Sequence, residues 1–394
     1  MEEFTPKLLL GSELKQALQI LPKYDSKIRN AQASERLIAL TQFYDIFYPS
    51  KMACEIYSKL YFAYLNAIKK KGSKQPKTSR GILGESDTFS IIGSSGIGKS
   101  TAIARAISII SQDDIVNINN SKVIPFLVVQ TPSDASIKGL LLEILRLVDE
   151  QLGTRYHNDA IRSRATLDML VSLSSKVFFN HIGVLVLDEI QNLVSAKNGQ
   201  NLVKSIVQLV NVSSISICFV GTPEAISFFE LEFHLARRSI GLSYSGFEND
   251  SSFEDLCHTL FKYQYTKNYT PLTRDIIDWL YIHSQGVLSV VVGLIYSSQQ
   301  IAILEEIESL NLETLSKAFN QRFEMLHYYL NLPNTPQRYS NNSNQEPFIT
   351  LNSTDKNPAH SFSLVEVIED AKQQKNDPIA CLKAYISIEE IAIC

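Results

Sequence analysis

TFSIIGSSGIGKSTAIARAISIIS, residues 88–111, is the part of the sequence from which a fold follows most directly. A short apolar run, residues 89–92, predicts a buried strand that ends at Gly93. From Gly93 to Ser100 the chain has the P-loop pattern G-x-x-x-x-G-K-S, and the apolar spacing after Lys99 predicts an amphipathic helix. Strand, loop and helix in this order are the context that the pattern needs, so we predict a phosphate-binding site here.

The residues of this pattern have the chemistry that nucleotide phosphates require. Glycines allow a tight turn, so successive N–H groups can face one anion, and the following helix adds its positive N-terminal end. Lys99 would reach the β- and γ-phosphates, and Ser100 would ligate Mg²⁺. A glycine turn without a ligand is the alternative. We therefore predict ATP and Mg²⁺ as cofactors, held by Gly93, Ser94, Ser95, Gly96, Ile97, Gly98, Lys99, Ser100 and Thr101.

Composition places the chain among ordinary globular proteins. Its 394 residues predict two domains with appendages, and its 45% hydrophobic content can form a substantial core. The net charge is −4, so nucleic-acid binding would need a local basic patch. Neither a signal peptide nor a run of about 18 apolar residues is present, so we expect no membrane association. Five scattered cysteines are typical of a reduced, cytoplasmic chain: Cys54, Cys218, Cys257, Cys381 and Cys394.

Residues 1–80 are predicted to form a helical N-terminal extension, with helices over 34–47 and 50–69. The segment is rich in Phe and Tyr. These aromatic side chains either pack on the following domain or form a docking surface for a protein partner. The basic run at 69–80 is either a solvated linker or a contact to nucleic-acid phosphates.

Residues 81–248 alternate between strand and helix patterns, which predicts a parallel five-stranded α/β sheet. The expected strands cover 89–92, 123–129, 184–187, 214–220 and 239–244. The polar stretch 153–164 predicts a surface loop. It carries Arg162 and Arg164.

A second motif is GVLVLDE at 183–189, the Walker B form. Acidic groups at the carboxyl end of a buried strand face ligands in α/β sheets. Asp188 would hold Mg²⁺ through water, and Glu189 would polarise the water that attacks the γ-phosphate. Alternatively, these acids cap the next helix. Thr222, after the fourth strand, would face the γ-phosphate, act as an N-cap, or do both.

The helix expected after Pro223 ends in Arg237 and Arg238. These arginines either complement the helix dipole or act as arginine fingers that reach a neighbouring subunit's nucleotide. Residues 249–330 are predicted to form an α-helical lid. Residues 331–394 are predicted to be a flexible, disordered linker and a C-terminal tail, which docks on a partner or folds back on the lid.

The order of these motifs resembles the AAA+ ATPases, and within them the TnsC family of transposition regulators, relatives of TniB and IstB. The likeness covers residues 35–330. It lies in GSSGIGKST at 93–101, VLVLDEIQNL at 184–193, FVGTPEA at 219–225, ARRS at 236–239 and SQGVLSVVVGL at 284–294. Many AAA+ proteins have an arginine where this chain has Ser289. TnsC-like proteins also tend to lack that arginine.

The resemblance implies a cytoplasmic, prokaryotic ATPase that assembles as a ring or filament on double-stranded DNA. ATP would bind between protomers, and Arg237 or Arg238 would come from the neighbour. The assembly would link a target selector of the TnsD or TniQ type to the transposase, and hydrolysis would disassemble it. The DNA-contact candidates are Lys122 and Lys138, followed by Arg162, Arg164 and the run 69–77.

Two other functions fit the same motifs. The first is another AAA+ DNA machine, such as a replication initiator or helicase loader, although no DNA-binding domain is evident after residue 330. The second is a nucleotide-gated signalling scaffold, which would not need Glu189.

Overall fold

The computed structural model describes residues 6–72, 88–132, 136–194, 215–230 and 240–326. These residues belong to one compact unit, 1–335, and the second unit, 336–394, lies outside the described residues. Four predictions also concern residues outside these ranges: Arg237, Arg238, the basic run beyond residue 72 and the C-terminal tail. The structure does not test them, and they stay predictions.

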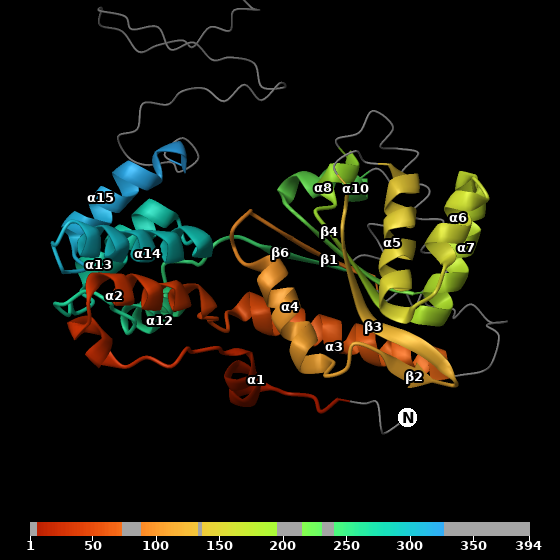
Figure 1. Cartoon of the computed structure of the whole chain (residues 1–394), viewed down its shortest axis with the longest axis horizontal. Helices are drawn as coiled ribbons and strands as arrows, with labels where there is room; N and C mark the ends of the chain where they lie inside the picture. Colours follow the sequence, from red (N-terminus) through yellow and green to blue (C-terminus); the bar gives the residue numbers. More distant parts are fainter. Residues whose placement is uncertain (1–5, 73–87, 133–135, 195–214, 231–239, 327–394) are drawn as a thin grey trace, which may run out of the picture. The chain divides into compact units, whose positions relative to one another are not determined.

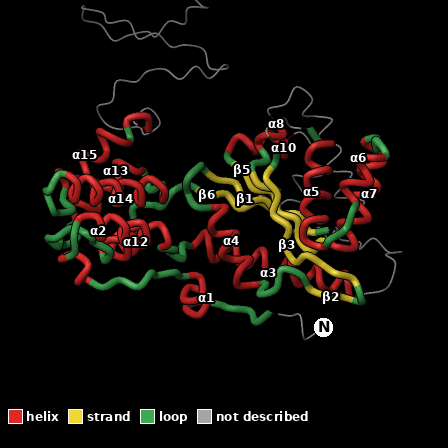
Figure 2. Tube along the Cα trace, viewed as in Figure 1, coloured by secondary structure: helices red, strands yellow, loops and turns green. Residues whose placement is uncertain are grey.

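The described residues contain one six-stranded sheet, whose strands are yellow in Figure 2. Its strand order is β2-β3-β4-β5-β1-β6. All neighbouring pairs are parallel except β2–β3. The strands are β1 (Phe89–Gly93), β2 (Val116–Ile118), β3 (Ser121–Gln130), β4 (Ile182–Asp188), β5 (Ser216–Gly221) and β6 (Ile240–Tyr244).

The five parallel strands are those predicted from the sequence, but the predicted strand count was wrong by one. The extra strand, β2, is three residues long and pairs with β3 across a tight hairpin. Asn119 and Asn120 form the hairpin turn with φ values of 51° and 65°. Asparagine tolerates this left-handed conformation, which suits a two-residue hairpin turn. A strand of three residues has too few positions to show a period.

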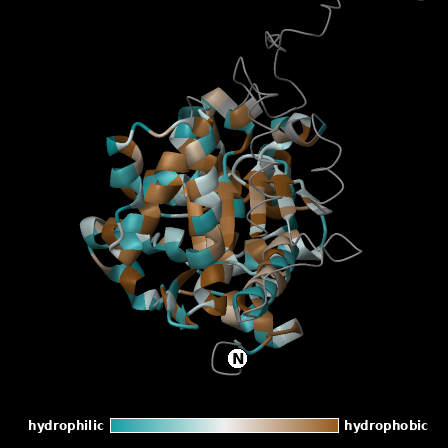
Figure 3. Cartoon of the chain, turned by 90° about the vertical axis from the view of Figure 1, so that its right-hand side faces the viewer, coloured by the Kyte–Doolittle hydropathy of each residue, from teal (hydrophilic) through white to brown (hydrophobic). Residues whose placement is uncertain are grey.

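Helices cover both faces of the sheet (Figure 1). On one face lie α5 (Ile137–Leu152), α6 (Tyr156–Arg162) and α7 (Leu167–His181). On the other lie α1 (Gly11–Leu18), α3 (Lys51–Gly72) and α4 (Lys99–Ile110). Strands β1, β4 and β5 are buried along their whole length, and Figure 3 shows hydrophobic strands between the layers. This double burial explains why they are continuous apolar runs rather than alternating ones.

Helix α6 corrects the loop predicted for 153–164. The segment is polar because most of the helix faces outward, with only Ala160 buried. Gly153, in the left-handed conformation at φ 72°, ends α5 and lets the chain turn into α6. A seven-residue helix with one buried position has no apolar period to detect.

The C-terminal helices form a bundle of their own: α12 (Ser251–Phe261), α13 (Arg274–Ser284), α14 (Leu288–Leu304) and α15 (Leu312–Arg322). Side-chain caps start three of them, from Asp250, Thr273 and Asn311. Only α14 is apolar over most of its surface, and it lies at the centre of the bundle core. No helix in the described part of the chain has the length and apolar character that crossing a bilayer requires.

The N-terminal segment is divided between two hydrophobic cores. Helices α1 and α3 pack on the sheet, whereas α2 (Ala33–Leu40) and the 3-10 helix η3 (Thr41–Asp45) pack into the α12–α15 bundle. Leu40 and Phe43 are fully buried there. Most of the aromatic residues in this segment therefore pack inside the unit. Tyr44 and Phe62, 57% and 54% exposed, are the ones left for a surface role.

A buried ion pair anchors α2 to the bundle. Arg36, 1% exposed, places its Nη1 and Nη2 at 2.6 and 2.7 Å from the two carboxylate oxygens of Glu308. Nη1 of Arg36 also donates to the carbonyl of Tyr265 at 3.1 Å. Two parallel charge-assisted hydrogen bonds fix orientation as well as distance, so this contact sets the position of α2 on the bundle.

Candidate active site

The P-loop connects the end of β1 to the start of α4. Gly96 and Gly98 have φ values of 81° and 93°, a conformation that side-chain-bearing residues seldom adopt. The Lys99 ammonium donates to the carbonyls of Gly93 at 2.6 Å and Ser94 at 3.0 Å. Burial lowers the pKa of Lys99, opposed by the charges of Asp188, Glu189 and Glu224. A largely buried cation at the N-terminus of a helix is an arrangement that binds phosphate.

The first turn of α14 lies directly on this loop. The N–H of Ser289 donates to the carbonyl of Gly96 at 3.0 Å. A Cβ on Gly96 would lie 2.2 Å from Ser289 Oγ, and one on Gly98 would lie 3.2 Å from a methyl of Leu288. Residue 289 therefore contacts the P-loop through its backbone, and this contact couples the bundle to the loop.

Ser100 and Asp188 meet across the sheet. Ser100 Oγ donates to Asp188 Oδ2 at 2.7 Å, although β1 and β4 are separated by β5. Both groups offer hard oxygen ligands, which Mg²⁺ prefers, and Mg²⁺ usually takes only one or two protein ligands beside phosphate and water. The pair therefore fits the predicted ion. The described residues contain no group of three or more His, Cys, Asp or Glu that would indicate a metal held by protein alone.

Glu189 occupies a sharp turn at the end of β4. Its φ is 59°, its N–H donates to Asp188 Oδ1 at 2.9 Å, and its side chain is exposed. Its carboxylate accepts a hydrogen bond from the side-chain amide of Gln191. Non-glycine residues with a left-handed backbone are uncommon, and they are found more often at functional sites.

Thr222 follows β5 at the same edge. Its N–H donates to Gln191 Oε1 at 3.2 Å. The Thr222 hydroxyl lowers the pKa of Glu224 by hydrogen bonding to its carboxylate. Thr222 stands at the N-cap position of the 3-10 helix η4 (Pro223–Ala225), but its side chain makes no capping bond. Its hydroxyl is therefore engaged with the neighbouring acid rather than with the helix end.

The structure thus brings five predicted site residues to one edge of the sheet. They are Lys99, Ser100, Asp188, Glu189 and Thr222. Gln191, in α8 (Gln191–Val194), joins them and was not predicted, although it lies within the VLVLDEIQNL motif. The sequence does show a glutamine two residues after Glu189, and this was the available signal for the residue. Its significance depends on Thr222, which is 31 residues away and near it only in the folded chain.

The four DNA-contact candidates are separated. Lys122 lies at the start of β3, whereas Lys138 lies in the first turn of α5, the helix that follows the other end of this ten-residue strand. At about 3.3 Å per residue these ends are roughly 30 Å apart. Arg162 ends α6, and Arg164 follows it with a φ of 51°. All four side chains are exposed.

The Lys122 end of the sheet is also where α3 brings its lysines. Asn119, in the β2–β3 turn, donates to the carbonyl of Lys71 at 3.0 Å. The last turn of α3 carries Lys69, Lys70 and Lys71. The Lys71 ammonium bonds the carbonyls of Phe178 and Phe179 at the end of α7, and burial lowers its pKa to about 8. Lys71 therefore caps the C-terminal end of α7. Lys69 and Lys70 belong to the same last turn of α3, near Lys122.

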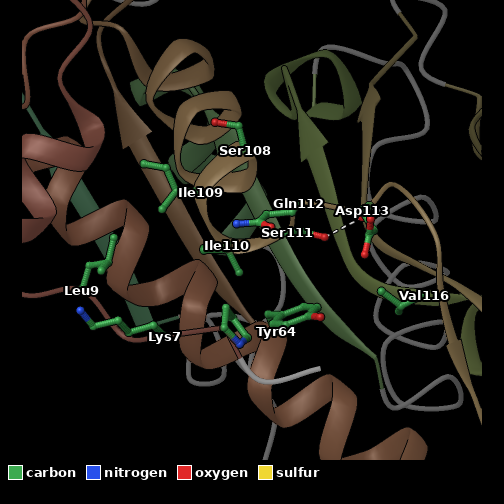
Figure 4. Close-up of a pocket in the computed structure, with 11 residues that line it drawn as sticks. Lys7, Leu9, Tyr64, Ser108, Ile109, Ile110, Ser111, Gln112, Asp113 and Val116 are labelled. Atoms are coloured by element: carbon green, nitrogen blue, oxygen red, sulfur yellow. Dashed lines mark hydrogen bonds between the residues drawn. The ribbon is translucent and has the colours of Figure 1, made fainter. Parts of the chain in front are cut away.

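A cavity of about 520 Å³ lies at the other end of α4 from the P-loop (Figure 4). It is lined by the N-terminal segment, α3 and the end of α4, through residues that include Leu9, Tyr64, Ile110 and Asp113. None of the described residues predicted to bind nucleotide lines it. The candidate active site is the edge formed by the P-loop, not this cavity.

Comparison with known proteins agrees with this geometry. Residues 85–229 match the AAA domain. This stretch contains the P-loop, the Asp188–Glu189 pair and Thr222. Together with the parallel sheet and its flanking helices, the match confirms the predicted α/β fold, that of an AAA+ P-loop NTPase.

Solved structures similar to this chain include the following three proteins. Aeropyrum pernix ORC2 has 16% identity and a TM-score of 0.46, with 69% of this chain and 68% of that chain covered. Pyrobaculum aerophilum Cdc6p has 14% identity and a TM-score of 0.47, with 67% and 65% covered. Drosophila ORC bound to DNA has 12% identity and a TM-score of 0.47, with 83% and 73% covered. None of the curated proteins matches the sequence.

Proposed function

We propose that this protein is an ATPase that hydrolyses ATP to ADP and phosphate. The observation that supports it best is the meeting of Lys99, the Ser100–Asp188 pair, Glu189 and Thr222 at one edge of the sheet. Each has a distinct task in phosphoryl transfer: anion binding, metal ligation, activation of water and contact with the γ-phosphate.

The hydrolysis step follows from these positions. Lys99 and the loop N–H groups bind the phosphates, and Ser100 and Asp188 would hold Mg²⁺, which would supply positive charge beside them. Glu189 accepts a proton from water as the water oxygen bonds to the γ-phosphorus. The bond from that phosphorus to the bridging oxygen breaks, and ADP leaves with the electron pair. Thr222 orients the γ-phosphate.

At the level of biological process, we propose an ATP-dependent regulator of DNA transposition. Its motifs resemble the TnsC family, and the position of Ser289 agrees with that family's departure from the wider AAA+ pattern. ATP would join protomers into a ring or filament on double-stranded DNA, with Arg237 or Arg238 completing the neighbour's site. The assembly would connect a target selector to the transposase and come apart on hydrolysis.

For the DNA contact we favour the edge of the sheet that carries Lys122. Lys69 and Lys70 lie toward the same end of the molecule, whereas Lys138 stands at the opposite end of β3. Several cations on one edge neutralise a phosphate backbone better than isolated ones do. Arg162 and Arg164 remain further candidates.

Analytical ultracentrifugation of the full chain tests the proposal. Large assemblies should form only when duplex DNA and a slowly hydrolysed ATP analogue are both present. Glu189→Gln should form long-lived assemblies with ATP itself, because binding is kept while hydrolysis is lost. ATP turnover without any effect of DNA would favour the signalling scaffold. Loading of a helicase, without any response to transposase, would favour the replication alternative.

A further inference from the structure

We propose that Gln191 is a positioning residue for Glu189, and that it transmits the position of Thr222 to that carboxylate. The inference rests on the proposed ATPase function and adds a residue to which no role has yet been assigned. Its basis is one carboxamide that contacts both strand ends. Nε2 of Gln191 donates to the Glu189 carboxylate, while Oε1 accepts from the Thr222 N–H at 3.2 Å.

The surroundings hold this carboxamide in place. A Cβ on Gly221 would lie 2.9 Å from Gln191 Oε1, so the glycine before Thr222 leaves the space that the carboxamide occupies. The backbone of α8 is tied on both sides, because the N–H of Ile190 donates to the carbonyl of Val220 at 3.0 Å and the N–H of Asn192 donates to the carbonyl of Glu189 at 3.0 Å. The backbone is therefore fixed, and Gln191 decides where the exposed carboxylate points.

This geometry has a consequence for turnover. Thr222 lies where the γ-phosphate would bind, and any shift of its backbone moves the N–H donor that holds Gln191. The amide that holds Glu189 moves with it. A misplacement of about 1 Å in a catalytic group can lower a rate about 100-fold. Gln191 thus links the arrival of the γ-phosphate to the placement of the general base.

Gln191→Glu separates the two contacts. The new carboxylate can still accept from the Thr222 N–H, but it cannot donate to Glu189 and repels it. We expect kcat for ATP hydrolysis, measured with duplex DNA, to fall about 10- to 100-fold. The affinity for fluorescent ADP and the melting temperature should stay close to those of the wild type. A residue that only supported the Thr222 strand would leave this variant near wild-type activity.

Two further variants complete the test. Asn192→Ala, the control, removes an amide that donates to the carbonyl of Thr131 from the same short helix, and it should keep kcat within about twofold. In a Glu189→Gln background, Gln191→Ala should cause no further loss, because its effect passes through Glu189. A further loss in that background, or wild-type kcat in Gln191→Glu, would overturn the inference alone. A wild type that does not hydrolyse ATP would overturn the proposed function as well.

Discussion

At the scale of single residues, the active-site chemistry depends on a few side chains in constrained surroundings. Lys99 is 9% exposed and has its ammonium among loop carbonyls, so an incoming phosphate would replace weaker partners. Glu189 has a strained backbone and an exposed carboxylate. The proposed function therefore assigns binding to Lys99 and chemistry to Glu189, and substitution should separate the two roles.

Lys99→Ala should weaken ATP binding about 100-fold, because it removes a charged donor to the phosphates. Assembly on DNA should be lost with it. Isothermal titration with ATP and sedimentation with DNA measure the two effects. Lys176→Ala removes an exposed lysine from α7 and serves as the control. Assemblies that persist in Lys99→Ala would contradict the role given to the P-loop.

At the scale of elements, the contact between α14 and the P-loop matters most. The Ser289 N–H and the Gly96 carbonyl join the loop to the bundle, and Gly96 has no room for a side chain. If the loop moves on binding phosphate, as the proposed function implies, this contact would carry the movement to α14. Because of this contact, a side chain added at Gly96 would push the P-loop away from α14.

Two glycine substitutions test this contact. Gly96→Ala and Gly153→Ala both place an alanine at positive φ, which costs about 1–2 kcal/mol. Nothing lies within 4 Å of a Cβ at Gly153, whereas Ser289 Oγ lies 2.2 Å from one at Gly96. Gly96→Ala should therefore lower the melting temperature and the ADP affinity further than Gly153→Ala does. Equal effects of the two would mean that α14 does not press on the loop.

At the scale of the whole molecule, long-range contacts join parts of the chain that the sequence separates. Arg36 and Glu308 are 272 positions apart, and their ion pair attaches the N-terminal segment to the α12–α15 bundle. The segment also packs on the sheet through α1 and α3. Residues 6–72 thus contribute to both cores.

Glu308→Gln should reduce the free energy of unfolding at pH 7 by about 3–5 kcal/mol, because it leaves the buried Arg36 without a counter-charge. The hydrogen bonds from Arg36 hold the pKa of Glu308 below its ordinary value, so the unfolded chain binds more protons in acid. The stabilisation is thus present above about pH 4.3 and is lost as the pH falls below it. Urea unfolding at pH 7 and at a series of pH values below about 4.3 should show the difference between wild type and variant narrowing as the pH falls.

The exposed Lys317–Glu305 pair supplies the control for that experiment. Glu305→Ala should change unfolding little at either pH, since exposed ion pairs contribute little to stability. An unfolding curve of Glu308→Gln equal to that of the wild type would show that the Arg36 contact does not hold α2.

The location of the DNA contact can be tested with substitutions at two distant lysines, Lys122 and Lys138. If the duplex follows the Lys122 edge, Lys122→Ala should reduce the slope of log K against log salt by about 0.9, one phosphate contact. Lys138→Ala, at the other end of β3, should leave the slope unchanged. Fluorescence anisotropy with labelled duplex and an ATP analogue measures both. The opposite pattern would place the duplex at the Lys138 end.

The sequence by itself determined the elements whose chemistry is local. The P-loop, the buried strands and the Asp188–Glu189 pair each depend on neighbours within a few positions, and periodicity and spacing record them directly. The tertiary structure alone decided which distant groups meet: Gln191 with Thr222, Ser289 with Gly96, and Arg36 with Glu308. It also placed Lys122 at the start of β3 and Lys138 in the helix that follows the other end of this strand. The physical reason is that side-chain contacts across a fold depend on strand order and helix packing, which leave no fixed spacing along the chain.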